Sequence, residues 1–258
     1  MARVFERLYP EFGAGGYHRH NPRIAFFSRI RTLLPDDAEV LDFGAGRGRF
    51  ALKEPRSMRR ITDVAPHCRR FAAFDVDEAV LGNVETSDRH HAPPGAALPF
   101  ADASFDLVYS WMVFEHVAAP AFYAAELARI VRPGGWICAG TPNSWGLVGI
   151  GARMLPNRLH GRALSIVSPR REERDIFPTT YRLNSRAAIR RHFPPAAFED
   201  HSFFTFSGPV HHADRTWIAR ACMAANWLTP PAMKSNFQVF LRKRGDQPSS
   251  ENTTARSS

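Results

Sequence analysis

The sequence has few of the features that mark a secreted, metal-binding or membrane-spanning protein. Its three cysteines, Cys68, Cys138 and Cys222, lie far apart and form no Cys-x-x-Cys pair. We therefore expect neither a disulfide framework nor a bound metal, and the histidines share no ligand spacing. No apolar run approaches the ~18 residues of a membrane span, and charges interrupt the first residues where a signal peptide needs an apolar core. These absences favour a cytoplasmic protein.

Lysine is scarce as well, although the chain is strongly basic. The net charge is +9, and only Lys53, Lys234 and Lys243 are lysines among 34 basic residues. The arginines are scattered in pairs such as Arg59-Arg60, without a long basic run or interleaved aromatic residues. A continuous basic stripe is what a nucleic-acid interface needs. We therefore do not favour nucleic acid as a partner, although the charge keeps it as an alternative.

At 258 residues the chain suits one domain with an added lobe. We expect a loop and a packing helix over 1–36 and the main domain over 37–244. A long Arg-rich stretch short of strand signals, at about 144–193, is expected to be an insertion on the substrate side. The polar tail, 245–258, cannot support a packed core and is expected to be disordered.

Strand and helix patterns alternate through the main domain. Asn21 and Pro22 are typical of a helix start, and Pro120 opens another helix that Pro133-Gly134-Gly135 should end. Strand patterns occupy 69–77, 104–111 and 136–143, and two further strands are expected at 198–208 and 236–244. Alternating strands and helices predict an α/β fold with a doubly wound, mostly parallel sheet, and ligands then bind at the carboxyl ends of the strands.

The stretch VLDFGAGRGRF, residues 40–50, is a glycine-rich turn after a strand. A dinucleotide fingerprint requires a third glycine where this chain has Arg49. Asp42, two residues before Gly44, would repel a pyrophosphate and attract a cation. S-adenosylmethionine carries an ammonium and a sulfonium but no phosphate. The glycines would let the backbone approach such a ligand closely.

Together with three later motifs, this turn resembles the class I S-adenosylmethionine-dependent methyltransferases. The motifs are FDVDEAVL, LPFADASFDLVYSWMVFEHV and RIVRPGGWICAGTPN, in that order, and the resemblance covers residues 40–143. It implies a Rossmann-like sheet of seven strands with a reversed last strand. Short phrases such as PNRLHGR also resemble a poorly characterised bacterial branch that is associated with polysaccharide and cell-envelope genes.

The resemblance also implies a set of cofactor-binding residues, in which the second-strand acid would accept the ribose hydroxyls. The set is Asp42, Gly44, Ala45, Gly46, Gly48, Asp75, Val76, Ser110 and Trp111. Two departures stand out. Asp42 and Asp75 are 33 residues apart (75 − 42 = 33), which indicates an inserted loop after the first helix. The usual acid for the adenine amino group is also missing, because the nearest one, Asp88, lies well before LPF.

Acceptor-side residues are harder to assign. His116 is the first candidate for a general base, although the Glu115-His116 pair could instead support the cofactor loop. Asn143, Tyr181 and Arg182 could contact the acceptor, or they could belong to a polar lid without substrate contact.

Our leading hypothesis is a methyltransferase acting on a small molecule or a glycan-type envelope precursor. An RNA or protein methyltransferase and a non-catalytic partner subunit with this fold remain alternatives. The oligomeric state is open. The apolar helix pattern TWIARACMAANWL, 216–228, could rest on a membrane interface. We favour a helix that closes the substrate cleft, because arginines are few there.

Overall fold

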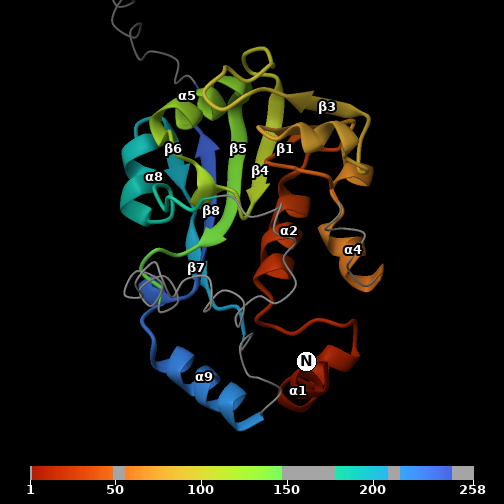
Figure 1. Cartoon of the computed structure of the whole chain (residues 1–258), viewed down its shortest axis with the longest axis vertical. Helices are drawn as coiled ribbons and strands as arrows, with labels where there is room; N and C mark the ends of the chain where they lie inside the picture. The colour runs from red at the N-terminus through yellow and green to blue at the C-terminus, as the bar shows by residue number, and fades with distance from the viewer. Residues whose placement is uncertain (1, 49–55, 147–177, 209–215, 246–258) are drawn as a thin grey trace, which may run out of the picture.

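A computed structural model describes residues 2–48, 56–146, 178–208 and 216–245. Its centre is one twisted sheet in the order β3-β2-β1-β4-β5-β8-β6, with β7 also paired to β8. Helices cover both faces of this sheet (Figure 1). The α/β, doubly wound architecture expected from the sequence is therefore confirmed.

Five neighbouring strands of the sheet run parallel to one another. In chain order these are β1 (Glu39–Phe43), β2 (Arg70–Asp75), β3 (Asp88–His91), β4 (Phe105–Trp111) and β5 (Val131–Pro142). In register, Asp42 of β1 lies beside Tyr109 of β4. The carboxyl ends of β1, β2 and β4 therefore meet at one edge, where the glycine turn begins.

The last strand, β8 (Asn236–Lys243), is antiparallel to β5, so the reversed strand that the resemblance implied is present. The edge position beyond it is occupied by two short strands, β6 (Phe198–Asp200) and β7 (Phe203–Thr205). Both pair with β8, β6 along its end and β7 along its start. The sheet thus has eight strand segments in the seven expected positions.

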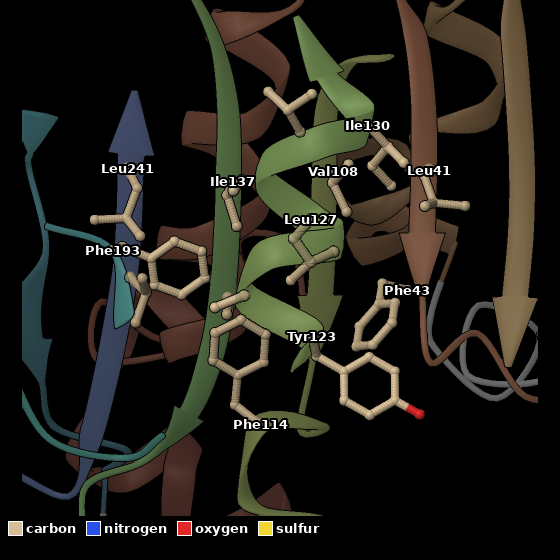
Figure 2. Packing of buried hydrophobic residues seen from close by; sticks show 14 of the residues in the cluster. Leu41, Phe43, Val108, Phe114, Tyr123, Leu127, Ile130, Ile137, Phe193 and Leu241 are labelled. Atoms are coloured by element: carbon tan, nitrogen blue, oxygen red, sulfur yellow. The ribbon is translucent and has the colours of Figure 1, made fainter. Parts of the chain in front are cut away.

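Each face of the sheet packs against its own helices. On one face, α2 (Pro22–Leu33) buries Phe26, Phe27 and Ile30. The other face is covered by α5 (Pro120–Ile130) and α8 (Arg186–His192). Figure 2 shows Leu127 and Ile130 of α5 packed on the side chains of the parallel strands. These two apolar layers hold the strand ends in fixed relation, which positions the site.

The helix ends follow the expected signals with one difference. Asn21 caps α2 by accepting hydrogen bonds from the amides of Arg23 and Ile24, at 3.0 and 3.3 Å. The helix α5 ends at Ile130, as expected within one residue, but Pro133-Gly134-Gly135 lie inside β5. The chain therefore passes from helix to strand at Val131, and Gly134, with a φ of +80°, shapes the start of the strand.

A separate group of elements lies beyond the carboxyl ends of the parallel strands (Figure 1). It contains α1 (Ala2–Leu8), the 3-10 turn η1 (Pro10–Gly13) and α9 (Thr216–Leu228), which lies beside α1. The loop after η1 is anchored by aromatic contacts, since His18 stacks on both Phe5 and Tyr9. In the described part of the chain, no helix is long and apolar enough to cross a membrane.

Several short elements complete the fold. They are α4 (Arg56–Thr62) and the 3-10 turns η2 (Ala65–His67), η3 (Glu78–Gly82), η4 (Phe114–His116) and η6 (Pro231–Met233). The expected inserted loop overlaps residues 49–55, the expected insertion at about 144–193 contains residues 147–177, and the expected disordered tail, 245–258, contains residues 246–258. These three segments lie outside the described residues.

Candidate functional site

The glycine turn after β1 adopts backbone conformations that favour glycine. Gly44, Gly46 and Gly48 have φ values of +82°, +48° and +67°. A Cβ on Gly44 would lie 2.4 Å from a methyl carbon of Val113, and one on Gly48 would lie 2.6 Å from the side-chain oxygen of Asn83. The turn therefore has no room for side chains at these two positions, because Val113 and Asn83 pack directly against its backbone.

Two side chains at the end of β2 and just beyond it hold this turn in place. The Asp75 carboxylate accepts hydrogen bonds from the amides of Gly46 and Asp77, at 2.8 and 3.0 Å. The amide of Asn83 donates to the carbonyl of Gly46 at 3.1 Å. Burial raises the pKa of Asp75 above its usual value, and the two amide hydrogen bonds act in the opposite direction.

A cavity of about 60 Å³ lies beside the turn, at the carboxyl ends of β1 and β4. Three acids, Asp42, Asp63 and Glu85, share its wall with one guanidinium, that of Arg23. The remaining lining residues are Phe27, Gly44, Ala45, Gly48, Thr62, Val64, Tyr109 and Trp111. The excess of acidic groups makes this cavity suited to a positively charged group.

The surroundings of Asp42 in this cavity disfavour its charged form. Burial raises its pKa well above the usual carboxyl value, and the nearby carboxylates of Glu85 and Asp75 raise it further. A hydrogen bond from Tyr109 and the charge of Arg23 lower the pKa in part. A cation placed against Asp42 would relieve both the desolvation and the repulsion. This observation tests the fit of the cofactor inferred from the sequence, and the residues present fit it.

Trp111, at the end of β4, forms part of the cavity wall and also packs in the core. Its ring lies 5.2 and 6.0 Å from the rings of Phe26 and Phe27. It also covers Gly140 so closely that a Cβ there would lie 2.3 Å from the indole. Its neighbour Ser110 is buried, and its hydroxyl has no hydrogen-bond partner among the described residues.

A second polar cluster lies on the α5 side of the sheet, around η4. The buried Glu115 accepts a hydrogen bond from the Thr141 hydroxyl at 2.9 Å. The Asn184 amide donates to that same hydroxyl at 2.5 Å. The Glu115 carbonyl also accepts from the amides of Thr180 and Tyr181, at 2.7 and 3.1 Å. Glu115 therefore joins β5, η4 and the segment that precedes α8.

The candidate base His116 ends η4 beside this cluster. Its Nδ1 lies 3.1 Å from the Pro178 carbonyl oxygen, which can only accept, so Nδ1 carries a hydrogen. When Nδ1 carries the hydrogen, Nε2 is the ring nitrogen whose lone pair could accept a proton from a substrate. Nε2 lies 3.9 Å from an Oε1 of Glu115.

The predicted acceptor residues are placed in two ways. Tyr181 and Arg182 lie along η4 near His116, and Arg182 donates to the Ala118 carbonyl at 2.7 Å. Asn143 is buried, and its amide donates to the carbonyls of Ala232 and Lys234 at 2.8 Å each. Asn143 thus fastens the end of β5 to the segment that joins α9 to β8. Its role in acceptor binding stays a prediction.

The structure gathers the predicted residues into two groups. Asp42, Gly44, Ala45, Gly48 and Trp111 line the cavity, and Gly46 is tied to Asp75 next to it. Val76 follows Asp75 and packs against the apolar core. The group around His116 lies apart from the cavity wall. Asp88, in contrast, opens β3 and pairs with Arg70, so it stands at the opposite end of the strands.

Several residues of the site were not identified from the sequence, among them Arg23, Asn83, Glu85 and Tyr109. Tyr109 could have been found, because the register of neighbouring parallel strands sets it beside Asp42. The other three come from α2 and the loop after η3, and no local pattern brings these segments to the turn. Among the described residues, no group of His, Cys, Asp and Glu could hold a metal ion.

Comparison with known proteins gives an independent result. Residues 41–139 match a family model described as a methyltransferase domain. A probable S-adenosylmethionine-dependent methyltransferase of Mycolicibacterium smegmatis is 37% identical over 109 residues, which are 41% of this chain and 38% of that protein. A ubiquinone biosynthesis O-methyltransferase of Albidiferax ferrireducens is 32% identical over 149 residues, 55% of this chain and 57% of its own length.

Both matches thus span well under two thirds of the relative concerned. Among solved structures, an S-adenosylmethionine-dependent methyltransferase from Methanosarcina mazei superposes with a TM-score of 0.51 at 15% identity. That similarity covers 84% of this chain and 98% of the other, and it concerns the fold alone.

Proposed function

We propose that the protein is a class I S-adenosylmethionine-dependent methyltransferase, built around the methyltransferase domain of residues 41–139, and that it transfers a methyl group from this cofactor to a small-molecule or glycan-type acceptor. The observation that carries the proposal is the acid-lined cavity beside a glycine turn that has no room for side chains. A phosphate-bearing nucleotide would meet three acidic side chains there. A sulfonium cofactor with an ammonium group would meet opposite charge.

The cofactor supplies an activated methyl group on a sulfonium, so the protein mainly has to align acceptor and methyl carbon. Asp42 would face the positive methionine end of the cofactor, and Asp75 would accept the ribose hydroxyls. The turn from Gly44 to Gly48 would allow close backbone approach. Trp111 would form part of the wall of the cofactor site, because it already lines the cavity.

On the acceptor side we assign His116 as the general base. With Nδ1–H held by the Pro178 carbonyl, Nε2 can take the proton of an acceptor hydroxyl as the oxygen–methyl bond forms. Tyr181 and Arg182 flank this position. Oxygen as the methylated atom is also supported by the ubiquinone biosynthesis O-methyltransferase among the relatives. An envelope precursor is one acceptor of this kind.

Two measurements test the proposal. Calorimetric titration with S-adenosylhomocysteine should show binding that Asp42→Ala weakens by at least about tenfold. Absence of binding would refute the cofactor assignment. Methyl transfer to a panel of hydroxyl acceptors should fall about 100-fold or more in kcat in His116→Ala, with KM for the cofactor unchanged.

If kcat does not change in His116→Ala, His116 is not the general base, but methyl transfer still stands.

The two alternative functions, an RNA or protein methyltransferase and a non-catalytic partner subunit, are distinguished by other measurements. Methylation of RNA or protein in the same assay, with RNA affinity falling steeply as salt rises, would favour the macromolecular acceptor. Cofactor binding without turnover on any acceptor would favour a partner subunit.

A further inference from the structure

The helix α9 presents its apolar side outward. Three large side chains on it are strongly exposed: Trp217 at 66%, Trp227 at 85% and Leu228 at 74%. Ala219 is buried, and the polar Asn226 is only partly exposed. A helix of a globular protein usually does the reverse, with its apolar stripe toward the core and its polar side in water. The exposed side of α9 therefore needs a partner.

These exposed residues form one stripe rather than scattered points. Trp217, Ala221, Ala224 and Leu228 follow the spacing i, i+4, i+7, i+11, which keeps them on one side of a helix over about 16 Å. All four are exposed. Trp227 flanks the stripe near its other end. A tryptophan near each end of an apolar stripe is a pattern suited to a lipid headgroup boundary, where the indole has one apolar and one wet side.

Arginines are few on α9 itself, and from the sequence this favoured a helix that closes the substrate cleft, but the exposed apolar side described above and the sign of the charge on and around the helix are suited to anionic lipid. The helix contains no acidic residue, and its exposed side carries Arg220. The neighbouring α1 exposes Arg7 together with one acid, Glu6. The chain as a whole carries a net charge of +9. A basic protein is drawn to an anionic surface over a Debye length before any side chain inserts.

A second copy of the chain fits this surface less well. A helix of 13 residues is about 20 Å long and about 10 Å wide, so one side of it offers roughly 200 Å². Stable protein interfaces bury roughly 800 Å² on each partner. An interfacial helix needs no such area, because its apolar side enters the headgroup region along its whole length.

From these observations we infer that α9 attaches the protein to the surface of an anionic lipid bilayer. The helix lies beyond the carboxyl ends of the parallel strands, on the same side as the glycine turn (Figure 1). The segment that follows α9 includes Ala232 and Lys234, whose carbonyls accept hydrogen bonds from the Asn143 amide. Attachment would therefore turn the side of the molecule that holds the carboxyl ends of the parallel strands toward the bilayer. If the proposed methyl transfer holds, the acceptor is a molecule at a lipid surface.

Vesicle binding tests this inference without any use of methyl transfer, so the two proposals fail separately. The full chain is sedimented with vesicles of phosphatidylcholine alone or with phosphatidylglycerol added. We expect binding to the anionic vesicles that weakens with salt, and a loss of at least about tenfold in Trp217→Ser/Trp227→Ser. Brominated lipids should quench tryptophan fluorescence in the wild type and much less in the double variant.

The matched control is Leu81→Ser, which removes an exposed apolar side chain, 54% accessible, outside α9. It should bind vesicles as the wild type does, and circular dichroism with thermal unfolding should confirm that both variants are folded, whether or not the protein binds the proposed cofactor. The inference is overturned if the wild type stays in the supernatant, or if the double variant sediments equally well. The inference is also overturned if light scattering shows a dimer of the wild type that the double variant does not form. The partner of α9 would then be a second copy of the chain.

Discussion

The carboxylate of Asp75 and the backbone amide of Gly46 are joined by a hydrogen bond of 2.8 Å. This bond connects the end of β2 to the glycine turn after β1, two segments 29 residues apart in the chain. Asp75, which we propose receives the ribose of the cofactor, therefore also holds the glycine turn in place.

We predict that Asp75→Ala weakens S-adenosylhomocysteine binding about 10- to 150-fold, the equivalent of roughly 1.5–3 kcal/mol for charged hydrogen bonds. Calorimetry measures the change. Asp77→Ala is the control, because Asp77 caps η3 through the amide of Ala79 and does not touch the glycine turn. Equal losses in the two variants would show that the effect is a general disturbance of this loop.

Cofactor binding should release protons through Asp42. In the free protein, burial and the Glu85 carboxylate keep the pKa of Asp42 well above its usual value. A bound cation favours the carboxylate and lowers that pKa, so affinity should rise with pH until Asp42 is ionised in the free protein. Titration in two buffers of different ionisation enthalpy measures the released protons. Asp42→Asn should release fewer, and an unchanged number would contradict the assignment.

The same raised pKa predicts that Asp42 destabilises the fold. The folded state retains a proton that the unfolded chain has released, so stability falls as pH rises above the ordinary carboxyl pKa of about 4 and continues to fall up to the folded pKa. Asp42→Asn should therefore increase the Tm by a few degrees at pH 8, and the gain should shrink toward pH 4. Thermal unfolding of both proteins across this range is the measurement. A variant less stable than wild type at pH 8 would show that the carboxylate is compensated by other contacts.

Gly44 should be one of the least replaceable residues of the turn. Gly44→Ala meets both a φ of +82° and the methyl groups of Val113, so we expect a loss of about 1–3 kcal/mol in stability and at least about tenfold in cofactor affinity. The double variant Gly44→Ala/Val113→Ala removes the clash but not the backbone strain. It should recover only part of the loss. Full recovery in urea unfolding would mean that the backbone strain is negligible.

We expect Glu115 to stabilise the fold and to take no direct part in methyl transfer. Glu115→Ala leaves the Thr141 hydroxyl without its acceptor inside the protein and opens a cavity, which should cost about 2–4 kcal/mol in urea unfolding. Glu115→Gln keeps an acceptor oxygen and should cost less than about 1.5 kcal/mol. Similar losses in the two variants would indicate that the charge, and not the hydrogen bond, matters here.

The sequence predicted the parts of the fold that depend on local patterns. The cap of α2 at Asn21, the ends of α5 and the glycine turn all arise from residues within a few positions of one another. The turn also predicted a cationic ligand, because Asp42 and the glycines are adjacent in the chain. These features needed no knowledge of long-range contacts.

The missed parts depend on contacts between distant segments. The Asn83 side chain binds the carbonyl of Gly46, which lies 37 residues earlier in the chain. Arg23, from α2, and Glu85, from the loop after η3, both line the cavity. The Asn143 amide binds carbonyls 89 and 91 residues further along the chain. A single sequence holds no signal for such pairings. The residues of the glycine turn could be predicted because they are adjacent in the chain, whereas the contacts around Asn143 could not, and the roles assigned to both groups stay predictions.

The close contact between Trp111 and Gly140 has an evolutionary consequence. With the indole resting where a Cβ would stand, neither position can change freely while the other remains as it is. A relative with a side chain at the position of Gly140 should therefore have a much smaller residue at that of Trp111, and its cavity should be wider on that side. We expect the residues at these two positions to vary together among related sequences. Paired substitution of the two residues would then change the size of the ligand that the cavity admits.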